Sequence, residues 1–186
     1  MKPLVLGNLS YGMYAIGVKD GSRPNACIAN TVMQISKATP SDAALVAVAL
    51  SKENYSCQCV EQEGIFSISV LSQDTPATVI GALGFVSGRG VDKLGNIRHK
   101  VLIEGVPVIK ENTCCWFLCK VISSMDVGQE MVFAAEIIAG SDSAIGTPIR
   151  SRDKAVKARS FLSSREKWKN VIMIYLLIIG TLLRLR

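Results

Sequence analysis

The feature that most constrains the fold is a succession of short apolar segments, each bounded by Gly, Pro, Asp or Asn residues. Segments of this kind, separated by turn signals, are typical of strands in antiparallel sheets. Two other stretches have helix-start signals. The sequence therefore predicts a mainly β, antiparallel barrel with a few short helices. The expected strands cover residues 9–18, 25–35, 43–50, 65–71, 101–103, 106–109, 113–121 and 130–138, and the expected helices cover residues 55–63 and 76–83.

Local signals fix several ends of these elements. Asp20-Gly21 predicts a hairpin turn after the first strand. Asn54 is a good N-cap for the first helix, and Gly64 is a typical residue for ending it. Thr75-Pro76 places a capping residue before a proline, which predicts the start of the second helix.

The spacing of the cysteines and the single histidine argue against a metal site. None of the six cysteines forms a C-x-x-C pair, and His99 is the only histidine. His99 stands between two cations, so we expect it in a solvated loop without a catalytic role. The cysteines are expected to be small, half-buried and reduced. The amino-terminal apolar run is too short for a signal peptide, and we expect a cytoplasmic protein.

The positive charge is confined to one end of the chain. The net charge is +6, yet residues 1–149 carry 11 basic and 13 acidic residues, whereas residues 150–186 carry 10 basic and 2 acidic ones. A nucleic-acid-binding barrel needs a basic groove and aromatic stacking platforms. The near-neutral body and the 6% aromatic content argue against nucleic acid as a partner.

Residues 84–93 form a glycine-rich stretch that could bind an anion. Three glycines allow close approach to the backbone, and Ser87, Arg89 and Lys93 can donate charge-assisted hydrogen bonds. The alternative is a surface turn with scattered cations. A second stretch, residues 50–56, ends an apolar strand in Lys, Asn and Ser at the start of a helix, where anions also bind.

Four segments together resemble the flavin reductase-like family, whose members are FMN-binding split β-barrels of Greek-key type. They are residues 9–14 (LSYGMY), 28–36 (IANTVMQIS), 66–72 (FSISVLS) and 84–93 (GFVSGRGVDK), in the family's order. The resemblance extends from about residue 2 to about residue 140. It implies one FMN-binding domain, which we place at residues 1–146.

The resemblance also implies a set of FMN-binding residues. The phosphate would be held at two corners, by Lys52, Asn54, Ser56, Ser87, Gly88, Arg89 and Lys93. The ring would lie against Ala29, Asn30 and Thr31, near the subunit boundary of a homodimer; ordinary alternation with a solvated face is the alternative for this strand. Ser56 stands where relatives often have Thr and keeps the hydroxyl. Cys57 stands where they often have His, which removes a cation from that corner.

The implied activity is hydride transfer from NAD(P)H to FMN, followed by electron transfer to free flavin, a rubredoxin or another acceptor. Hydride transfer to a flavin requires no general acid or base, so no catalytic residue is assigned. A non-enzymatic FMN electron carrier would share every binding motif. A nucleic-acid-binding barrel is the weaker alternative. The sequence does not distinguish NADH from NADPH.

Residues 147–186 depart from the family, whose members continue with Tyr-rich and Pro-rich segments. A basic, helix-compatible run is followed by 13 nearly uninterrupted apolar residues, 171–183. This is short of the roughly 20 residues that a spanning helix needs. Three interpretations are open: an interfacial membrane anchor, a helix packed on the barrel or on a second subunit, or a change of reading frame. The third is favoured, with membrane contact a minor alternative.

Overall fold

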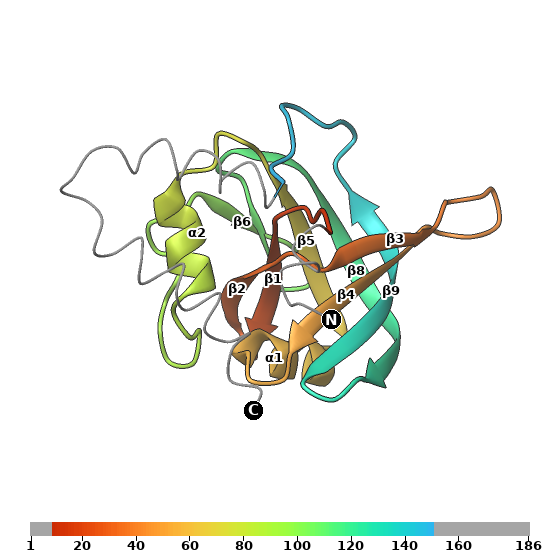
Figure 1. Cartoon of the computed structure of the whole chain (residues 1–186), viewed down its shortest axis with the longest axis horizontal. Helices are drawn as coiled ribbons and strands as arrows, with labels where there is room; N and C mark the ends of the chain where they lie inside the picture. Colours follow the sequence, from red (N-terminus) through yellow and green to blue (C-terminus); the bar gives the residue numbers. More distant parts are fainter. Residues whose placement is uncertain (1–8, 151–186) are drawn as a thin grey trace. The chain divides into compact units, whose positions relative to one another are not determined.

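The computed structural model of the chain describes residues 9–150, and residues 1–8 and 151–186 lie outside the described part. A seven-stranded antiparallel sheet has the strand order β2-β1-β5-β8-β9-β4-β3, and a two-stranded hairpin pairs β6 with β7 (Figure 1). The strands are β1 Tyr14–Asp20, β2 Arg23–Ala29, β3 Val32–Ser36, β4 Leu45–Ser51, β5 Ile65–Leu71, β6 His99–Val101, β7 Pro107–Ile109, β8 Thr113–Asp126 and β9 Glu130–Gly140, and the helices are α1 Tyr55–Glu63 and α2 Ala77–Gly84.

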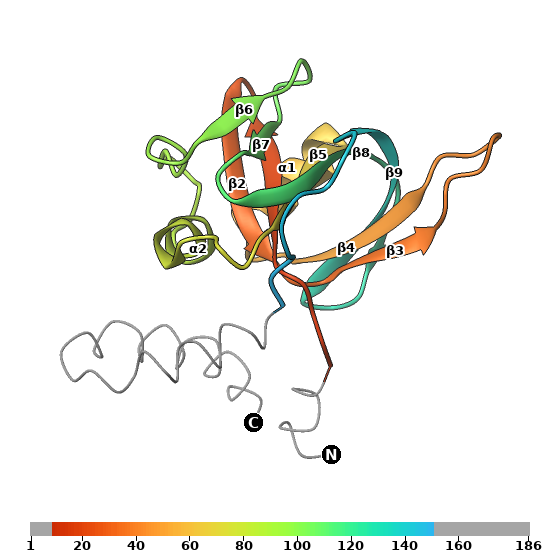
Figure 2. The ribbon, with the colours of Figure 1, turned by 90° about the horizontal axis from the view of Figure 1, so that it is seen from above.

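The order of the strands forces the sheet to curve. β2 and β3 lie at opposite edges of the sheet, yet only Asn30 and Thr31 separate them in the chain. The two edges must therefore meet at this end, and Figure 2 shows the sheet curling round on itself. β2 and β3 are not neighbours in the hydrogen-bonded order, so the barrel is split along this seam. The predicted split β-barrel is confirmed.

Two apolar cores follow from this curvature. The first fills the barrel with side chains from its strands and from α1, and Phe66 and Phe133 are its largest fully buried members. In β4 the alternate residues Val46, Val48 and Leu50 point into this core. The second core lies beneath α2, where Val79 and Leu83 are buried.

β5 separates the two cores and is buried on both faces. Its alternating pattern is present, but Ser67 and Ser69 are fully buried. Ser67 Oγ donates to the carbonyl of Pro107, and Ser69 Oγ accepts from the amide of Ile109 at 3.0 Å. These hydroxyls thus satisfy backbone groups of β7 that would otherwise lack partners, which fixes the β6–β7 hairpin against the sheet.

The first helix begins and ends as predicted. Asn54 Oδ1 accepts from the amide of Ser56 at 3.2 Å, and Gly64 has φ 64° with its amide donating to Val60. The start of α2 differs from the prediction. Pro76 occupies the N-cap position, with no side-chain cap, and the hydroxyl of Thr75 instead donates to the carbonyl of Asn112.

Two other expectations were wrong. The predicted strand 25–35 is two strands, because Asn30 and Thr31 carry the chain from one edge of the sheet to the other. His99 is the first residue of β6 rather than part of a loop, and its Nδ1 lies 2.7 Å from the carbonyl oxygen of Ile97.

The chain packs on the barrel beyond the predicted domain boundary at residue 146. Ser72 bridges Pro148, and the buried Ile149 donates its amide to Leu71 at 2.9 Å. The remaining predictions for the tail concern residues outside the described part. Between residues 9 and 150 no helix is long and apolar enough to cross a membrane.

Candidate functional site

A cleft of about 430 Å³ opens where β2 passes into β3. Ala29, Asn30 and Thr31, predicted to face a ring, lie on its wall together with Asn54, which was predicted to bind phosphate. The cleft thus joins the seam of the barrel to the start of α1. Its lining residues are Ile28, Ala29, Asn30, Thr31, Ala49, Leu50, Ser51, Asn54, Val127 and Glu130.

The β8–β9 turn forms another wall of this cleft. Lys52 is tied to this turn twice, through its amide, which donates to Gln129 at 3.0 Å, and through its ammonium, which lies 2.5 Å from Asp126 Oδ1. This ion pair lowers the pKa of Asp126 and partly neutralises the charge of Lys52. Lys52 therefore fixes the turn against β4 as well as bringing a cation to this end of the barrel.

The first turn of α1 supplies polar groups next to the cleft. Asn54 caps the helix, and Ser56, the next predicted phosphate residue, is buried. Burial, together with Glu61 and Glu130, raises the pKa of Cys57 to about 11, so its thiol is neutral at pH 7. A thiolate at this position would cancel part of the positive charge at the start of α1, and the neutral thiol does not.

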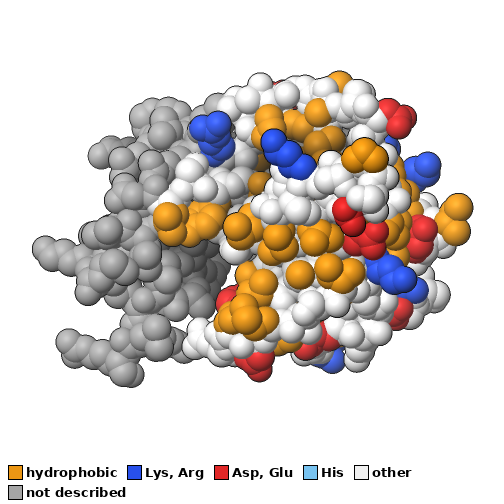
Figure 3. Space-filling view, turned by 90° about the vertical axis from the view of Figure 1, so that its right-hand side faces the viewer, with side chains coloured by type: hydrophobic (Ala, Val, Ile, Leu, Met, Phe, Trp, Pro, Cys, Tyr) orange, Lys and Arg blue, Asp and Glu red, His pale blue; other side chains and the backbone are white. Residues whose placement is uncertain are grey.

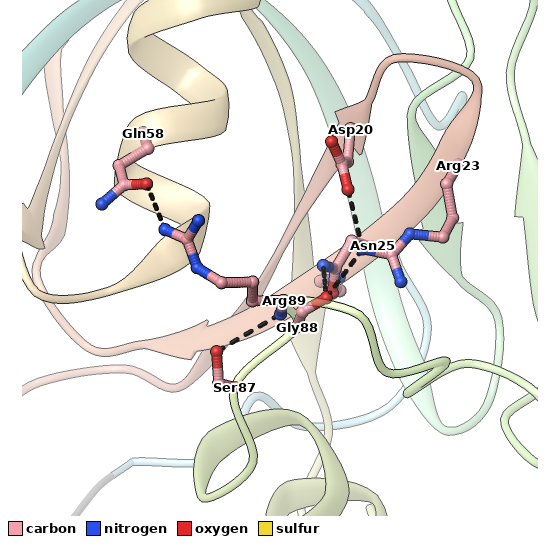
Figure 4. Close-up of polar contacts among 8 residues, drawn as sticks. Asp20, Arg23, Asn25, Gln58, Ser87, Gly88 and Arg89 are labelled. Atoms are coloured by element: carbon pink, nitrogen blue, oxygen red, sulfur yellow. Dashed lines mark hydrogen bonds and ion pairs between the residues drawn. The ribbon is translucent and has the colours of Figure 1, made fainter.

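The glycine-rich loop after α2 reaches the same helix. The guanidinium of Arg89 lies 4.5 Å from the centre of the Tyr55 ring and donates to Gln58 Oε1 at 2.7 Å. The amide of Arg89 donates to Ser87 Oγ at 3.3 Å. Figure 4 shows Arg89 extending from the loop to α1. The loop at residues 87–89 and the start of α1, which are distant in sequence, are thus brought together; the family resemblance implied that both would hold the phosphate.

Three residues that sequence reasoning missed hold this loop in place. The carbonyl of Gly88 accepts from Arg23 at 2.9 Å and from the buried Asn25 at 3.1 Å. Asp20 in turn accepts from Arg23 at 2.7 Å, as drawn in Figure 4. A Cβ atom on Gly88 would collide with the Asn25 amide, so only glycine fits. No local pattern marks these partners, because they lie on the β1–β2 hairpin, more than 60 residues away.

Lys93 has contacts different from those predicted. Its ammonium donates to the carbonyls of Leu83 at 2.9 Å and Val86 at 3.0 Å, and only 8% of the residue is exposed. Burial lowers the pKa of Lys93. Both carbonyls belong to the end of α2 and the residues after it, which need partners when a helix stops. Lys93 therefore caps α2, and the structure does not place it with Arg89.

These surroundings fit a flavin that carries a phosphate. A small, partly apolar cleft with backbone and amide groups suits the ring, and a glycine loop, a hydroxyl, a guanidinium and a helix start suit a phosphate. The two parts meet at Asn54 and Tyr55, which are adjacent in the chain. Across residues 9–150 no group of three potential ligands could hold a metal ion, and the cysteines are free.

Comparison with known proteins identifies the family and the fold. The flavin reductase like domain matches residues 6–149, most of the chain and all of the candidate site. The chain belongs to the flavin reductase-like family. This is the family that the four sequence segments resemble.

Two named proteins are similar to this chain in sequence. A high molecular weight rubredoxin from Moorella thermoacetica is 34% identical over 137 residues, which are 74% of this chain and 58% of that protein. The chain thus spans little more than half of that relative. A ferric-chelate reductase (NAD(P)H) from Archaeoglobus fulgidus is 32% identical over 130 residues, 70% of this chain and 75% of that protein.

Solved structures show the same fold at lower identity. Flavoredoxin from Methanosarcina acetivorans superposes with a TM-score of 0.64 at 22% identity, covering 75% of each chain. An NADH:FAD oxidoreductase from Streptomyces globisporus superposes with a TM-score of 0.66 at 20% identity, covering 74% of this chain and 78% of that one. At such identities the likeness concerns the barrel itself.

Proposed function

We propose that this flavoprotein binds FMN, takes hydride from NADH or NADPH, and passes the electrons to free flavin, a rubredoxin or another acceptor. The observation that carries the proposal is the meeting of the cleft with the Ser87–Arg89 loop at the first turn of α1. A terminal phosphate there gains a guanidinium, a hydroxyl and the helix dipole, which favours FMN over a flavin whose phosphates are internal.

Each residue has a defined part in this proposal. Ala29, Asn30 and Thr31 flank the ring, where backbone donors meet the negative charge that gathers on a flavin as it is reduced. Ser87, Gly88 and Arg89 hold the phosphate, and Lys52, Asn54 and Ser56 shape the opposite corner. The flavin supplies the redox chemistry, and the protein supplies placement and electrostatics.

The names of relatives support the donor and the acceptor. The archaeal ferric-chelate reductase is described as using NAD(P)H, and a rubredoxin is named for the bacterial relative. An FMN-binding protein from Thermus thermophilus superposes on this chain with a TM-score of 0.61. The cysteines within residues 9–150 are free, five of them buried, which suits a reducing cytoplasm.

We also propose a homodimer that covers the outer face of β3, β4, β9 and β8. On neighbouring strands Met33 lies opposite Ala47, and Ala47 lies opposite Ala134. Figure 3 shows the apolar side chains on this side of the molecule. Ala49 of this sheet also lines the cleft, so a second copy would border the flavin. The large exposed apolar residues of these strands are Met33, Ile35, Ile122, Met125 and Ile138.

The proposal is tested by a visible absorption spectrum of the purified chain, with release and identification of the pigment. We expect flavin bands and FMN at about one per chain, bleached anaerobically by NADH or NADPH. A colourless protein that ignores added FMN would overturn the cofactor assignment. Bound FMN that neither nucleotide bleaches would instead show a non-enzymatic electron carrier.

A further inference from the structure

Glu130 is the one acidic residue among those that line the cleft. It is the first residue of β9, lies opposite Ser51 of β4 in the sheet, and is half-buried. Ala29, Asn30 and Thr31 line the same cleft. The proposed ring site therefore has a carboxyl group on its wall.

The carboxyl group of Glu130 has no partner in the part of the chain that the structure describes: no hydrogen bond or ion pair reaches it within residues 9–150. Burial raises its pKa without any compensating donor. Lys52 forms its ion pair with Asp126, and the nearby Cys57 thiol is neutral, so neither of them balances the charge of Glu130. A partly shielded charge without a partner costs free energy and suggests a function.

A carboxylate in this position acts on whatever charge develops in the cleft. Two-electron reduction adds two electrons and one or two protons to a flavin, and with one proton the ring gains a negative charge. Two like charges repel more strongly in a partly dry cleft than in water. An ionised Glu130 would thus oppose reduction, whereas a protonated Glu130 would not.

We propose that ionised Glu130 lowers the reduction potential of the flavin bound in this cleft and so makes the reduced flavin a stronger electron donor. This inference rests on the flavin site proposed above. It gives the cleft a pH-dependent control: as the pH falls through the titration of Glu130, the opposition to reduction disappears. Of the charged groups near this corner, Lys52 is paired with Asp126, and the Cys57 thiol, whose pKa both Glu61 and Glu130 raise, is neutral; Glu61 lies on α1 and does not line the cleft.

The test is a spectroelectrochemical titration of the full chain saturated with FMN, from pH 5 to pH 8. Glu130→Gln removes the charge and keeps the shape of the side chain. Glu136→Gln removes the same charge from the same strand at a position that does not line the cleft. We expect Glu130→Gln to favour the reduced flavin by about tenfold at pH 8 and by progressively less as the pH falls toward 5, with Glu136→Gln close to wild type throughout.

Three outcomes would overturn the inference. One is a potential that is the same in Glu130→Gln and the wild type at every pH. Another is an equal shift in Glu136→Gln, which would show a general charge effect. The third is a wild-type potential whose pH dependence shows no break from the titration of a carboxyl group. This outcome would overturn the inference even if Glu130→Gln failed to fold. Failure of the wild type to bind FMN would remove the proposed function as well, which a binding titration reveals first.

Discussion

Gly88 is the residue whose size most directly shapes the proposed phosphate corner. Gly88→Ala would drive a Cβ into the Asn25 amide and displace the carbonyl that Arg23 and Asn25 hold. We expect this displacement to weaken FMN binding about tenfold, the value of one hydrogen bond to a charged group. Fluorescence quenching of FMN measures the affinity.

Riboflavin and a second glycine provide the controls for this substitution. Riboflavin lacks the phosphate, so its affinity should be equal in Gly88→Ala and the wild type. Gly81→Ala adds the same methyl group inside α2, where the nearest atom, from Phe85, is 4.0 Å away, and FMN binding should be unchanged. An equal loss of riboflavin affinity would show that Gly88 supports the fold rather than a phosphate.

Asp20 acts on the same loop through Arg23, and its effect depends on pH. The hydrogen bond from Arg23, with a second from Tyr55, lowers the pKa of Asp20. A lowered pKa means that the ionised form stabilises the fold above the ordinary pKa and that this stabilisation is lost as the pH falls through the lowered value. We expect Asp20→Asn to lower the melting temperature at pH 7 and to have a smaller effect at pH 3. A difference that is constant between these pH values would contradict this role.

Arg89 and Lys93 show what the sequence could not reveal at this scale. Both are cations of the same glycine-rich stretch, and both were predicted to bind phosphate. The fold directs Arg89 to Tyr55 and Gln58 on α1, and it directs Lys93 to the carbonyls of α2. Composition shows that this loop carries two cations but not where each of them points. Which cation is free for a ligand depends on partners elsewhere in the fold.

At the scale of the element, α1 depends on its two caps. Asn54→Ala removes the acceptor for the Ser56 amide, and Gly64→Ala places a methyl group at φ 64°. Each should lower the free energy of unfolding by about 1 kcal/mol. Only Asn54 lines the cleft, so only Asn54→Ala should also weaken FMN binding. Urea unfolding and FMN titration on both variants separate the two effects; equal FMN affinities would remove Asn54 from the site.

Both ends of α1 were predictable, whereas the break between β2 and β3 was not. Caps are local, since Asn54 and Gly64 contact residues within one helical turn. The turn at Asn30 and Thr31 exists because β2 pairs with β1 whereas β3 pairs with β4, at the other edge of the sheet. These pairings depend on the arrangement of the whole barrel. A continuous apolar and polar alternation gave no sign that the chain changes edge there. Long-range pairing therefore decided the feature on which the cleft depends.

At the scale of the whole molecule, the sheet has an exposed apolar face that the proposed dimer would cover. Met33 is 63% exposed on the edge strand β3, beside Ala47 and, one strand further, Ala134. Small residues beside a large one let two sheets approach closely, and each buried apolar side chain adds to the free energy of association. Burying such a face would also exclude water from the side of the cleft that Ala49 forms.

Met33→Lys should therefore convert a dimer into a monomer, since a lysine on this face would have to be desolvated without a partner when a second copy covers it. Light scattering after gel filtration measures the mass. Ile103→Lys makes the same exchange on the fully exposed tip of the β6–β7 hairpin and should leave the dimer intact. If the flavin lies at the boundary between copies, Met33→Lys should also bind FMN more weakly in proportion to its loss of dimer. A monomeric wild type would contradict the dimer. If it also bound FMN with the same affinity as Met33→Lys, one barrel would be sufficient to form the site.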